Sequence, residues 1–281
     1  MHLASPLSPV RAAAAAGTAA PMVPAVVRAM ALLDRLAHNR QPMSMARLAA
    51  ELSLPRSSVH GLCNTLLTLG YLRRQADGAF QIGPRVMALA EAFLAGTDVS
   101  REFDALWQSD REAPEETVLL SVLDGADVVY LAARHGTRPL GMAFTVGMRL
   151  PAHIAATGKA MLAFQPPERV RQLLGTGPLS RPTGRGPAQL DGADGLAAEL
   201  ALARDRGYSI DDEGVRLGVW CIAAPVLDAA GRPLAGIGVC LNKAMLAQGD
   251  AARERERVLE TARALSLRLG GDGSLPKREQ P

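Results

Sequence analysis

The apolar residues near the start of the chain recur every three or four positions, as they do on one face of an amphipathic helix. These residues are Val26, Val27, Met30, Leu33, Leu36 and Ala37. The pattern predicts a first helix that ends near His38. A second, shorter helix is predicted to run to Glu51 from Ser44, whose hydroxyl suits the N-cap position.

A third helix is predicted over residues 56–69. Proline is well suited to a helix start, where Pro55 lies, and glycine to a helix end, where Gly70 lies. Two short strands, 71–74 and 80–82, flank an Asp-Gly pair that favours hairpin turns. Two helices, a tight turn, a third helix and a hairpin, in this order, are typical of a winged helix-turn-helix.

The pattern changes after this segment. An apolar linker helix is predicted over 85–98, and strands and helices then alternate without a regular βαβ order. The predicted strands are 117–123, 127–133, 140–146, 208–211, 219–227 and 234–241. One helix is predicted to begin near residue 155, and two others are predicted to span 190–206 and 250–269. We therefore expect an α+β fold: a tail (1–22), a winged helix-turn-helix (23–84), the linker, a mixed α/β domain (99–270) and a second tail (271–281).

The charge is distributed unevenly along the chain. The 281 residues contain 31 Lys and Arg against 28 Asp and Glu, a formal charge of only +3. Residues 25–85 contain eight arginines and three acids, a charge of +5, so the residues that follow are net negative. The positive charge lies where the winged helix is predicted, which favours a nucleic-acid partner for that segment.

Several classes of protein are excluded by composition. Three cysteines without a CxxC pair, and five histidines, give neither a disulfide framework nor a zinc-ligand spacing. No apolar run is long enough to cross a membrane, and the Ala-rich start lacks the basic n-region of a signal peptide. We expect a cytoplasmic protein without a cofactor, a metal or a catalytic residue.

The third helix presents side chains of the types that contact DNA. Val59, Leu62, Leu66 and Leu69 form its predicted buried stripe, which leaves arginine, serine, histidine and asparagine facing outward. Arginine can bridge guanine, asparagine can bridge adenine, and hydroxyls or basic side chains can contact phosphates. The candidate DNA-contact residues are Arg47, Arg56, Ser57, Ser58, His60, Asn64, Arg73 and Arg74. A solvated face of a protein-binding winged helix is the alternative.

Two segments of the second half could bind or transform a small molecule. Small residues at 155–158 open a helix, where free N–H groups favour an anion such as a carboxylate, although close helix packing would need the same residues. An acidic loop at 211–213 has no nucleophile near it in sequence, which argues against acid–base catalysis. Cys221 and Cys240 lie on successive predicted strands and can face one cavity. They are either inert buried thiols or the thiols of an enzyme that acts on a small carboxylate.

Four segments in this order resemble bacterial transcriptional regulators of the IclR family over residues 23–270. They are LPRSSVHGLCNTLLTLGYLRR, GAFQIGPRVMALA, LPAHIAATGKAMLAF and RGYSIDDEGVRLGVWCIAAPV. The resemblance implies a winged helix, a linker helix and a GAF-like domain that binds an organic-acid effector. It also implies a homodimer or tetramer that binds a palindromic double-stranded DNA operator as a repressor or activator, often of a catabolic pathway.

The resemblance also implies an effector site. Its residues are Met142, Leu150, Ala156, Thr157, Asp211, Trp220, Cys221, Gly238 and Cys240. Members that hold very small keto acids tend to carry serines at the last two positions, and many members carry arginine in place of the tryptophan. We therefore expect a roomier, less polar pocket for a larger, more apolar acid, aromatic acids included. In the third helix, Gly61 replaces a frequent arginine.

Overall fold

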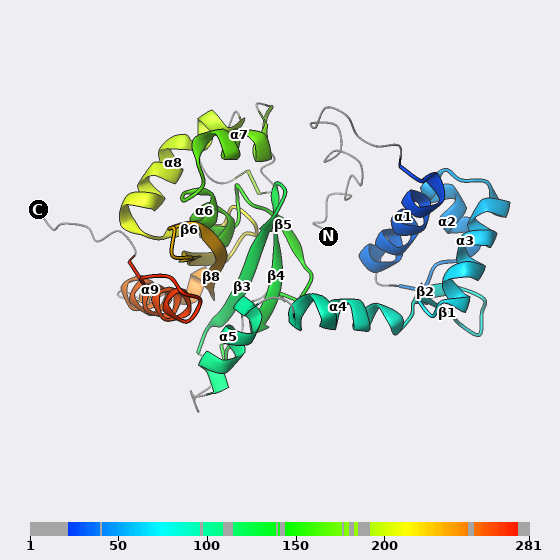
Figure 1. Ribbon diagram of the computed structural model, residues 1–281, viewed down its shortest axis with the longest axis horizontal. Coiled ribbons are helices and arrows are strands. Elements are labelled where there is room, and N and C mark those ends of the chain that lie inside the picture. The colour runs from blue at the N-terminus through cyan, green and yellow to red at the C-terminus, as the bar shows by residue number, and fades with distance from the viewer. Residues whose placement is uncertain are drawn as a thin grey trace, which may run out of the picture. The chain divides into compact units, whose positions relative to one another are not determined.

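A computed structural model describes the chain in two compact units, residues 1–96 and 97–281, which are treated separately (Figure 1). The described residues are 22–39, 41–95, 98–108, 115–138, 140, 144–175, 177–179, 183–184, 192–246 and 250–274. The predicted N-terminal tail lies outside them apart from Met22, and so do residues 275–281 of the predicted C-terminal tail.

The first unit is a winged helix-turn-helix, as predicted. Its elements are α1 (Pro24–Asn39), α2 (Met45–Leu52), α3 (Arg56–Thr68), β1 (Leu72–Arg74), β2 (Phe80–Ile82) and α4 (Arg85–Ala95). The wing is the antiparallel pair β1–β2. Its core is formed by apolar residues from α1, α2, α3 and the wing, among them Leu32, Leu48, Val59 and Phe80.

Local sequence signals set the ends of these elements. The Ser44 hydroxyl accepts a hydrogen bond from the Arg47 amide at 3.3 Å and caps α2, as its position in the sequence predicted. Gly70 has a φ of +77°, a left-handed conformation that glycine adopts without strain, and it turns the chain from α3 into the wing. α4 spans Arg85–Ala95, and residues 96–97 of the predicted linker helix lie outside the described residues.

The second unit is built on a six-stranded antiparallel sheet in the order β5-β4-β3-β8-β7-β6. The strands are β3 (Thr117–Asp124), β4 (Asp127–Arg134), β5 (Arg149–Pro151), β6 (Ser209–Asp212), β7 (Val219–Leu227) and β8 (Pro233–Asn242). Long hairpins place β3 beside β4 and β7 beside β8, and the central pairing of β3 with β8 joins the two halves.

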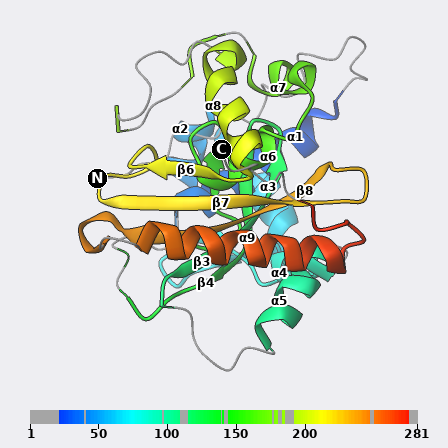
Figure 2. The same ribbon diagram turned by 90° about the vertical axis from the view of Figure 1, so that its left-hand side faces the viewer.

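Helices cover both faces of this sheet, as Figure 2 shows. They are α5 (Asp98–Gln108), α6 (Ala156–Leu162), α7 (Pro167–Leu174), α8 (Gly192–Arg206), a 3-10 turn η2 (Lys243–Met245) and α9 (Asp250–Arg268). α6 packs on the sheet, with α8 behind it and α7 beside α8, whereas α9 packs against β7 and β8 from the other face. The strands β7 and β8 are therefore buried on both sides.

Three predictions for this unit need correction. The predicted strand 140–146 does not form where the structure describes it: Phe144 packs edge-on against Tyr130, and residues 145–148 make a turn closed by the Met148 amide on the Thr145 carbonyl. The edge strand is β5, three residues further on. α5 and α7 were not expected, because their short apolar patterns are weak without the neighbours they pack on.

Candidate DNA-contact face and effector pocket

The outward face of α3 presents the side chains that the sequence assigns to DNA. Arg56, Ser57, His60 and Asn64 are exposed, and Ser58 is half-buried. The Asn64 side-chain amide lies 3.3 Å from the ring nitrogen Nδ1 of His60, one helical turn earlier. Among the described residues no carboxylate pairs with Arg56, so its guanidinium is available for a phosphate or a guanine.

The inward stripe of α3 differs from the predicted one at its C-terminal end. Val59 and Leu66 are buried, as expected. Leu69 is 55% exposed, because α3 ends at Thr68 and the chain turns away there. Leu62 is only half-buried, and the neighbouring Cys63 fills the core; burial raises the pKa of its thiol to about 11.

Arg47 is tied to its own domain. Its Nε donates to Glu51 Oε1 at 2.7 Å and its Nη2 to Asn39 Oδ1 at 3.1 Å. Arg35 pairs with the same glutamate, and hydrogen bonds from the two guanidinium groups lower the pKa of the Glu51 carboxyl. Arg47 therefore links α1 to α2, and a DNA contact by this side chain would compete with that link.

The two wing arginines are exposed at the hairpin. Arg73 lies opposite Gln81 in the strand register. The Arg74 guanidinium stacks over the Phe80 ring at 5.6 Å, and its Nε donates to the Gly78 carbonyl at 3.3 Å. Arg74 is thereby held against the hairpin turn of the wing.

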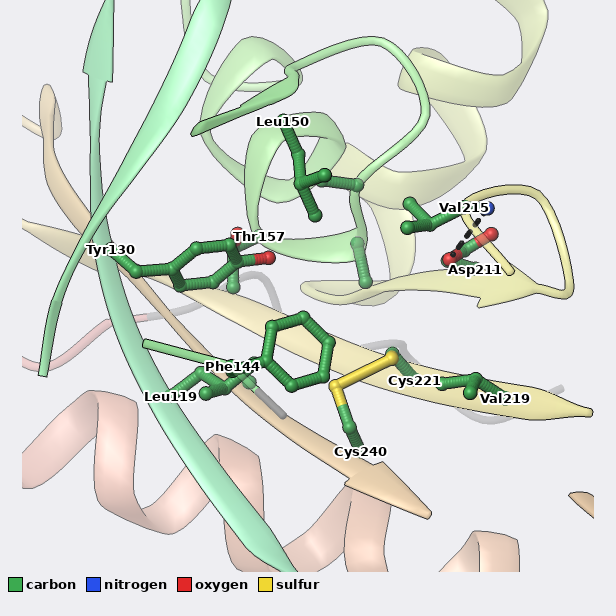
Figure 3. Close-up of a pocket in the computed structure, with 13 residues that line it drawn as sticks. Leu119, Tyr130, Phe144, Leu150, Thr157, Asp211, Val215, Val219, Cys221 and Cys240 are labelled. Atoms are coloured by element: carbon green, nitrogen blue, oxygen red, sulfur yellow. Dashed lines mark hydrogen bonds between the residues drawn. A yellow bond between two sulfur atoms is a disulfide. The ribbon is translucent and has the colours of Figure 1, made fainter. Parts of the chain in front are cut away.

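A cavity of about 10 Å³ lies between α6 and the sheet of the second unit (Figure 3), roughly enough for one water molecule. Its lining comes from the sheet, from the start of α6 and from two loops. The lining residues are Leu119, Tyr130, Phe144, Leu150, Ala155, Ala156, Thr157, Asp211, Val215, Val219, Cys221, Gly238 and Cys240. Seven of the nine predicted effector-site residues are in this set.

Two predicted effector-site residues, Trp220 and Met142, are not among those that line the cavity. Val219 and Cys221 point from β7 toward α6 and line the cavity, so Trp220 between them points to the opposite face. Trp220 is buried but does not line the cavity, which corrects its predicted place in the pocket. Met142 lies outside the described residues.

The start of α6 is packed very closely against its neighbours. A Cβ at Gly158 would collide with the backbone of Ala152, so this glycine serves close packing, the alternative raised above. A Cβ at Gly238 would come within 2.9 Å of the Thr157 methyl. The space that glycine leaves on β8 is filled by Thr157, so Gly238 does not make this pocket roomier.

Hydroxyl groups form the polar centre of the cavity. The Ser121 hydroxyl donates to Thr157 Oγ1 at 2.8 Å, and the Tyr130 hydroxyl is hydrogen-bonded with Thr157 as well. Burial raises the pKa of Tyr130, so the phenol stays neutral at physiological pH. α6 begins at Ala156, and the first amides of a helix have no carbonyl partner within it. An oxygen-rich ligand group can therefore be bound beside Thr157.

Asp211 faces the cavity and also holds the loop that closes it. Its Oδ1 accepts from the Gly214 amide at 2.7 Å and its Oδ2 from the Val215 amide at 3.3 Å. Burial raises the pKa of its carboxyl to about 6, although the nearby Lys159 ammonium and the two amide hydrogen bonds act in the opposite direction. Asp211 thus positions Val215 over the cavity and is partly protonated in mildly acidic solution.

The two strand cysteines form a disulfide, contrary to the prediction of free thiols. Cys221 and Cys240 are direct register partners on β7 and β8, with Cα atoms 4.2 Å apart. A sulfur in a disulfide is not a nucleophile, which removes the thiol on which the enzyme hypothesis depended.

The described residues contain no group of three or more His, Cys, Asp or Glu side chains that could hold a metal ion.

Comparison with known proteins identifies this combination of domains. The family model of the bacterial transcriptional regulator IclR C-terminal domain matches residues 92–267, and that of the IclR helix-turn-helix domain matches residues 25–76. The chain belongs to the IclR family. As an IclR-family protein it is a DNA-binding transcriptional regulator controlled by a small-molecule effector.

Relatives of the IclR family align with nearly the whole chain. The transcriptional repressor IclR of Escherichia coli (strain K12) is 29% identical over 262 residues, 92% of this chain and 94% of that one. The crystal structure of the Agobacterium tumefaciens repressor BlcR is 38% identical with a TM-score of 0.55, covering 89% of this chain and 98% of that one. An IclR homologue of Microbacterium hydrocarbonoxydans complexed with 4-hydroxybenzoate shares the fold at 23% identity and a TM-score of 0.69, covering 87% and 98%.

The sequence missed those pocket residues of this IclR-family protein that only tertiary structure brings together. Tyr130 and Phe144, from β4 and the following loop, line the cavity, and Ser121 on β3 contacts the lining residue Thr157; nothing in their local sequence marks them. The strand periodicity of 117–123 and 127–133 could have placed Ser121 and Tyr130 on one face, but not opposite α6.

No described helix is long and apolar enough to span a lipid bilayer.

Proposed function

We propose that this protein binds a palindromic operator in the cytoplasm as a homodimer or tetramer and that an organic acid, preferably aromatic, changes its affinity for that DNA. The proposal rests on one observation above all. A positively charged winged helix with an open recognition face is joined to a domain whose cavity combines aromatic walls with a cluster of hydroxyls.

The DNA part of the proposal assigns base contacts to α3 and backbone contacts to the wing. Arg56, His60 and Asn64 would lie in the major groove, with Ser57 and Ser58 near phosphates at the start of the helix. Arg73 and Arg74 would contact the backbone or the minor groove beside it. Arg47 would contribute only if DNA displaced Glu51 from its guanidinium.

Fluorescence anisotropy with DNA from the protein's own upstream region tests this assignment. The wild-type protein should prefer that DNA to a scrambled competitor at moderate salt. Arg56→Ala should weaken specific binding about 5- to 150-fold and relax base preference, whereas Arg74→Ala should mainly lower the salt dependence. Arg232→Ala is a matched control, because this exposed arginine belongs to the second unit and pairs with Asp228. Equal affinity for both DNAs would refute the proposal.

The effector part of the proposal follows from the lining of the cavity. Tyr130 and Phe144 meet edge to face with centroids 5.4 Å apart, and Leu119 and Leu150 extend this apolar wall. The hydroxyls and the α6 start offer hydrogen bonds to one polar end of a ligand. A relative of this fold is complexed with 4-hydroxybenzoate, which has such a shape. Because the cavity holds about one water, the ligand must displace Val215 or Phe144 as it enters.

A thermal-shift screen of aliphatic and aromatic carboxylates tests the class of effector. A ligand that binds the folded form raises the midpoint by mass action, so benzoate-type acids should raise it more than their amides. Thr157→Val should reduce the shift. Thr261→Val on α9 is the control, since that hydroxyl donates to the Arg257 carbonyl, outside the cavity. Equal shifts by acids and amides would rule out carboxylate recognition.

A further inference from the structure

The disulfide forms part of the wall of the cavity. Cys221 is 6% exposed and Cys240 3%, and both sulfurs lie beside the Phe144 ring in Figure 3. Val219 flanks them on the same strand face. A change at these sulfurs is therefore a change in the shape of the proposed effector site.

Backbone pairing and helix packing also hold β7 and β8 together, besides the disulfide. β7 and β8 are paired from Val219 opposite Asn242 to Leu227 opposite Pro233, and both strands are covered by helices. The cysteine pair lies near one end of this ladder. Strand pairing alone keeps the two residues opposite each other, so the reduced protein should retain its fold and hold its two thiols ready to bond again.

Reduction would alter the cavity in two ways. Two thiols that are not bonded to each other must lie farther apart than the roughly 2 Å of a disulfide, so sulfur atoms would move into a cavity of about 10 Å³. Each thiol also adds a weak S–H donor where the disulfide has none. The reduced pocket is thus smaller beside Phe144 and slightly more polar.

We propose that Cys221 and Cys240 form a reversible redox site in the pocket wall, oxidised by small hydroperoxides and reduced by low-molecular-weight thiols, and that its state sets the affinity for DNA. The coupling to DNA rests on the proposed function. In the oxidation, one cysteine takes an oxygen atom from the hydroperoxide as a sulfenic acid and releases water or an alcohol. The second thiol then attacks that sulfur, forms the S–S bond and releases the oxygen as water. Two thiols lose two protons and two electrons, which the peroxide accepts. In the reduction, two thiol groups of the reductant supply two protons and two electrons and are left joined as a disulfide.

The cavity favours a small oxidant. Any reagent larger than water reaches the sulfurs only when Val215 or Phe144 is displaced, as proposed for the effector, and hydrogen peroxide and small thiols need less displacement than oxidised glutathione. The third cysteine does not compete. Cys63 is fully buried in the core of the first unit, and its raised pKa keeps it as an unreactive thiol.

Thiol counting on the full-length protein tests the redox site directly. The protein is reduced with dithiothreitol, desalted, divided, and one half is treated with hydrogen peroxide at a small molar excess. Both halves are then alkylated under denaturing conditions and analysed by mass spectrometry. We expect three labels on the reduced form, one label at Cys63 on the oxidised form, and three again after renewed reduction. Labels on both strand cysteines after peroxide would overturn the proposal, as would failure of dithiothreitol to restore them.

Anisotropy with the upstream DNA then tests the coupling. The two redox forms of the wild-type protein should differ at least 5-fold in affinity, the lower end of typical allosteric coupling. Cys240→Ala cannot form the bond, and its affinity should change less than twofold upon peroxide treatment. Circular dichroism confirms that it folds, and Cys221→Ala replaces it if it does not. Equal affinity of the two wild-type forms would overturn the coupling. Binding by neither form would refute the proposed function and the coupling, while the label count still decides the redox site.

Discussion

Gly61 lies in the middle of α3, and nothing surrounds the position that its Cβ would occupy within 4 Å. Packing therefore does not require glycine there, although glycine in a helix costs about 0.5 to 1 kcal/mol relative to alanine. Family members often have arginine at this position, whereas this chain has no side chain there on the DNA-contact face. This position should accept a duplex at closer range than a side chain would allow.

Gly61→Ala should raise the free energy of unfolding by about 0.5 to 1 kcal/mol, because it removes the helix penalty without a clash. Urea unfolding followed by circular dichroism measures this change. Gly83→Ala is the contrasting variant: its Cβ would lie 2.9 Å from the Leu72 amide nitrogen and even closer to the Gly70 carbonyl, so it should destabilise the first unit. A Gly61→Ala protein no more stable than wild type would contradict this prediction.

Asp211 should make stability fall as pH rises from about 4 to about 6. Its carboxyl has a pKa near 6 when folded and an ordinary value of 3.8, so the folded state holds the proton more tightly in this range. In the wild-type protein this effect lowers the free energy of unfolding by about 2 to 3 kcal/mol between these two pH values, and Asp211→Asn should abolish that decrease. Chemical denaturation at a series of pH values provides the comparison. Asp205→Asn, at an exposed position of α8 outside the cavity, should keep the wild-type slope, and identical slopes in all three proteins would contradict the prediction.

Single residues were predictable from sequence where a local rule or a family motif marks them. Thr157, Asp211 and Gly238 were placed in the pocket by resemblance, and all three line it. Trp220 was misplaced because its face depends on the phase of β7, which a fully apolar strand does not reveal. The Cys221–Cys240 bond was missed because strand register, not spacing, brings those two residues together.

At the scale of elements, long amphipathic helices and hairpins were predicted well. The α3 helix and the β7–β8 hairpin were found within a few residues of their expected bounds. The segment around Phe144 was misread as a strand, because its apolar residues are buried by contact with Tyr130 and not by alternation in a sheet. Short elements such as α7 depend on tertiary packing for both their stability and their recognition.

The contact between α6 and α8 depends on a buried ion pair. Lys159 of α6 pairs with Glu199 of α8, and their side chains are only 8% and 22% exposed. Glu199→Gln would leave the lysine charge without its partner, at a cost of about 2 to 4 kcal/mol in unfolding free energy. A double variant, Lys159→Met with Glu199→Leu, should recover most of that loss, because it removes both charges of the pair together. Thermal and urea unfolding of all three proteins test this, and a double variant as unstable as the single one would contradict it.

On the scale of the whole molecule, the two units differ in net charge, and each has its own apolar core. Residues 25–85 carry +5, and the residues after 85 are net negative. Each unit has its own cluster of buried apolar residues, one around α1–α3 and the wing and one between α6 and the sheet. The order of the domains and the charge asymmetry were readable from sequence, whereas the sheet order with β3 against β8 was not, because it joins strands more than a hundred residues apart.

A fragment of residues 97–281 should therefore fold without the winged helix. It contains all six strands of the large sheet and the helices on both faces. We expect a single cooperative urea transition by circular dichroism and no measurable binding of the upstream DNA, because the positive segment is missing. A fragment without cooperative unfolding would mean that the first unit contributes to the stability of the second.

The close contact at Gly83 has a mechanical consequence for signalling. Its amide donates to the Tyr71 carbonyl, the Arg85 amide donates to the Gly70 carbonyl, and no side chain could be inserted at residue 83. The first turn of α4 is thus clamped to the junction between α3 and the wing. α4 has 11 residues and spans roughly 16 Å. A torque applied to its far end would rotate the DNA-contact face as one piece, with α4 as a lever and no hinge at its base.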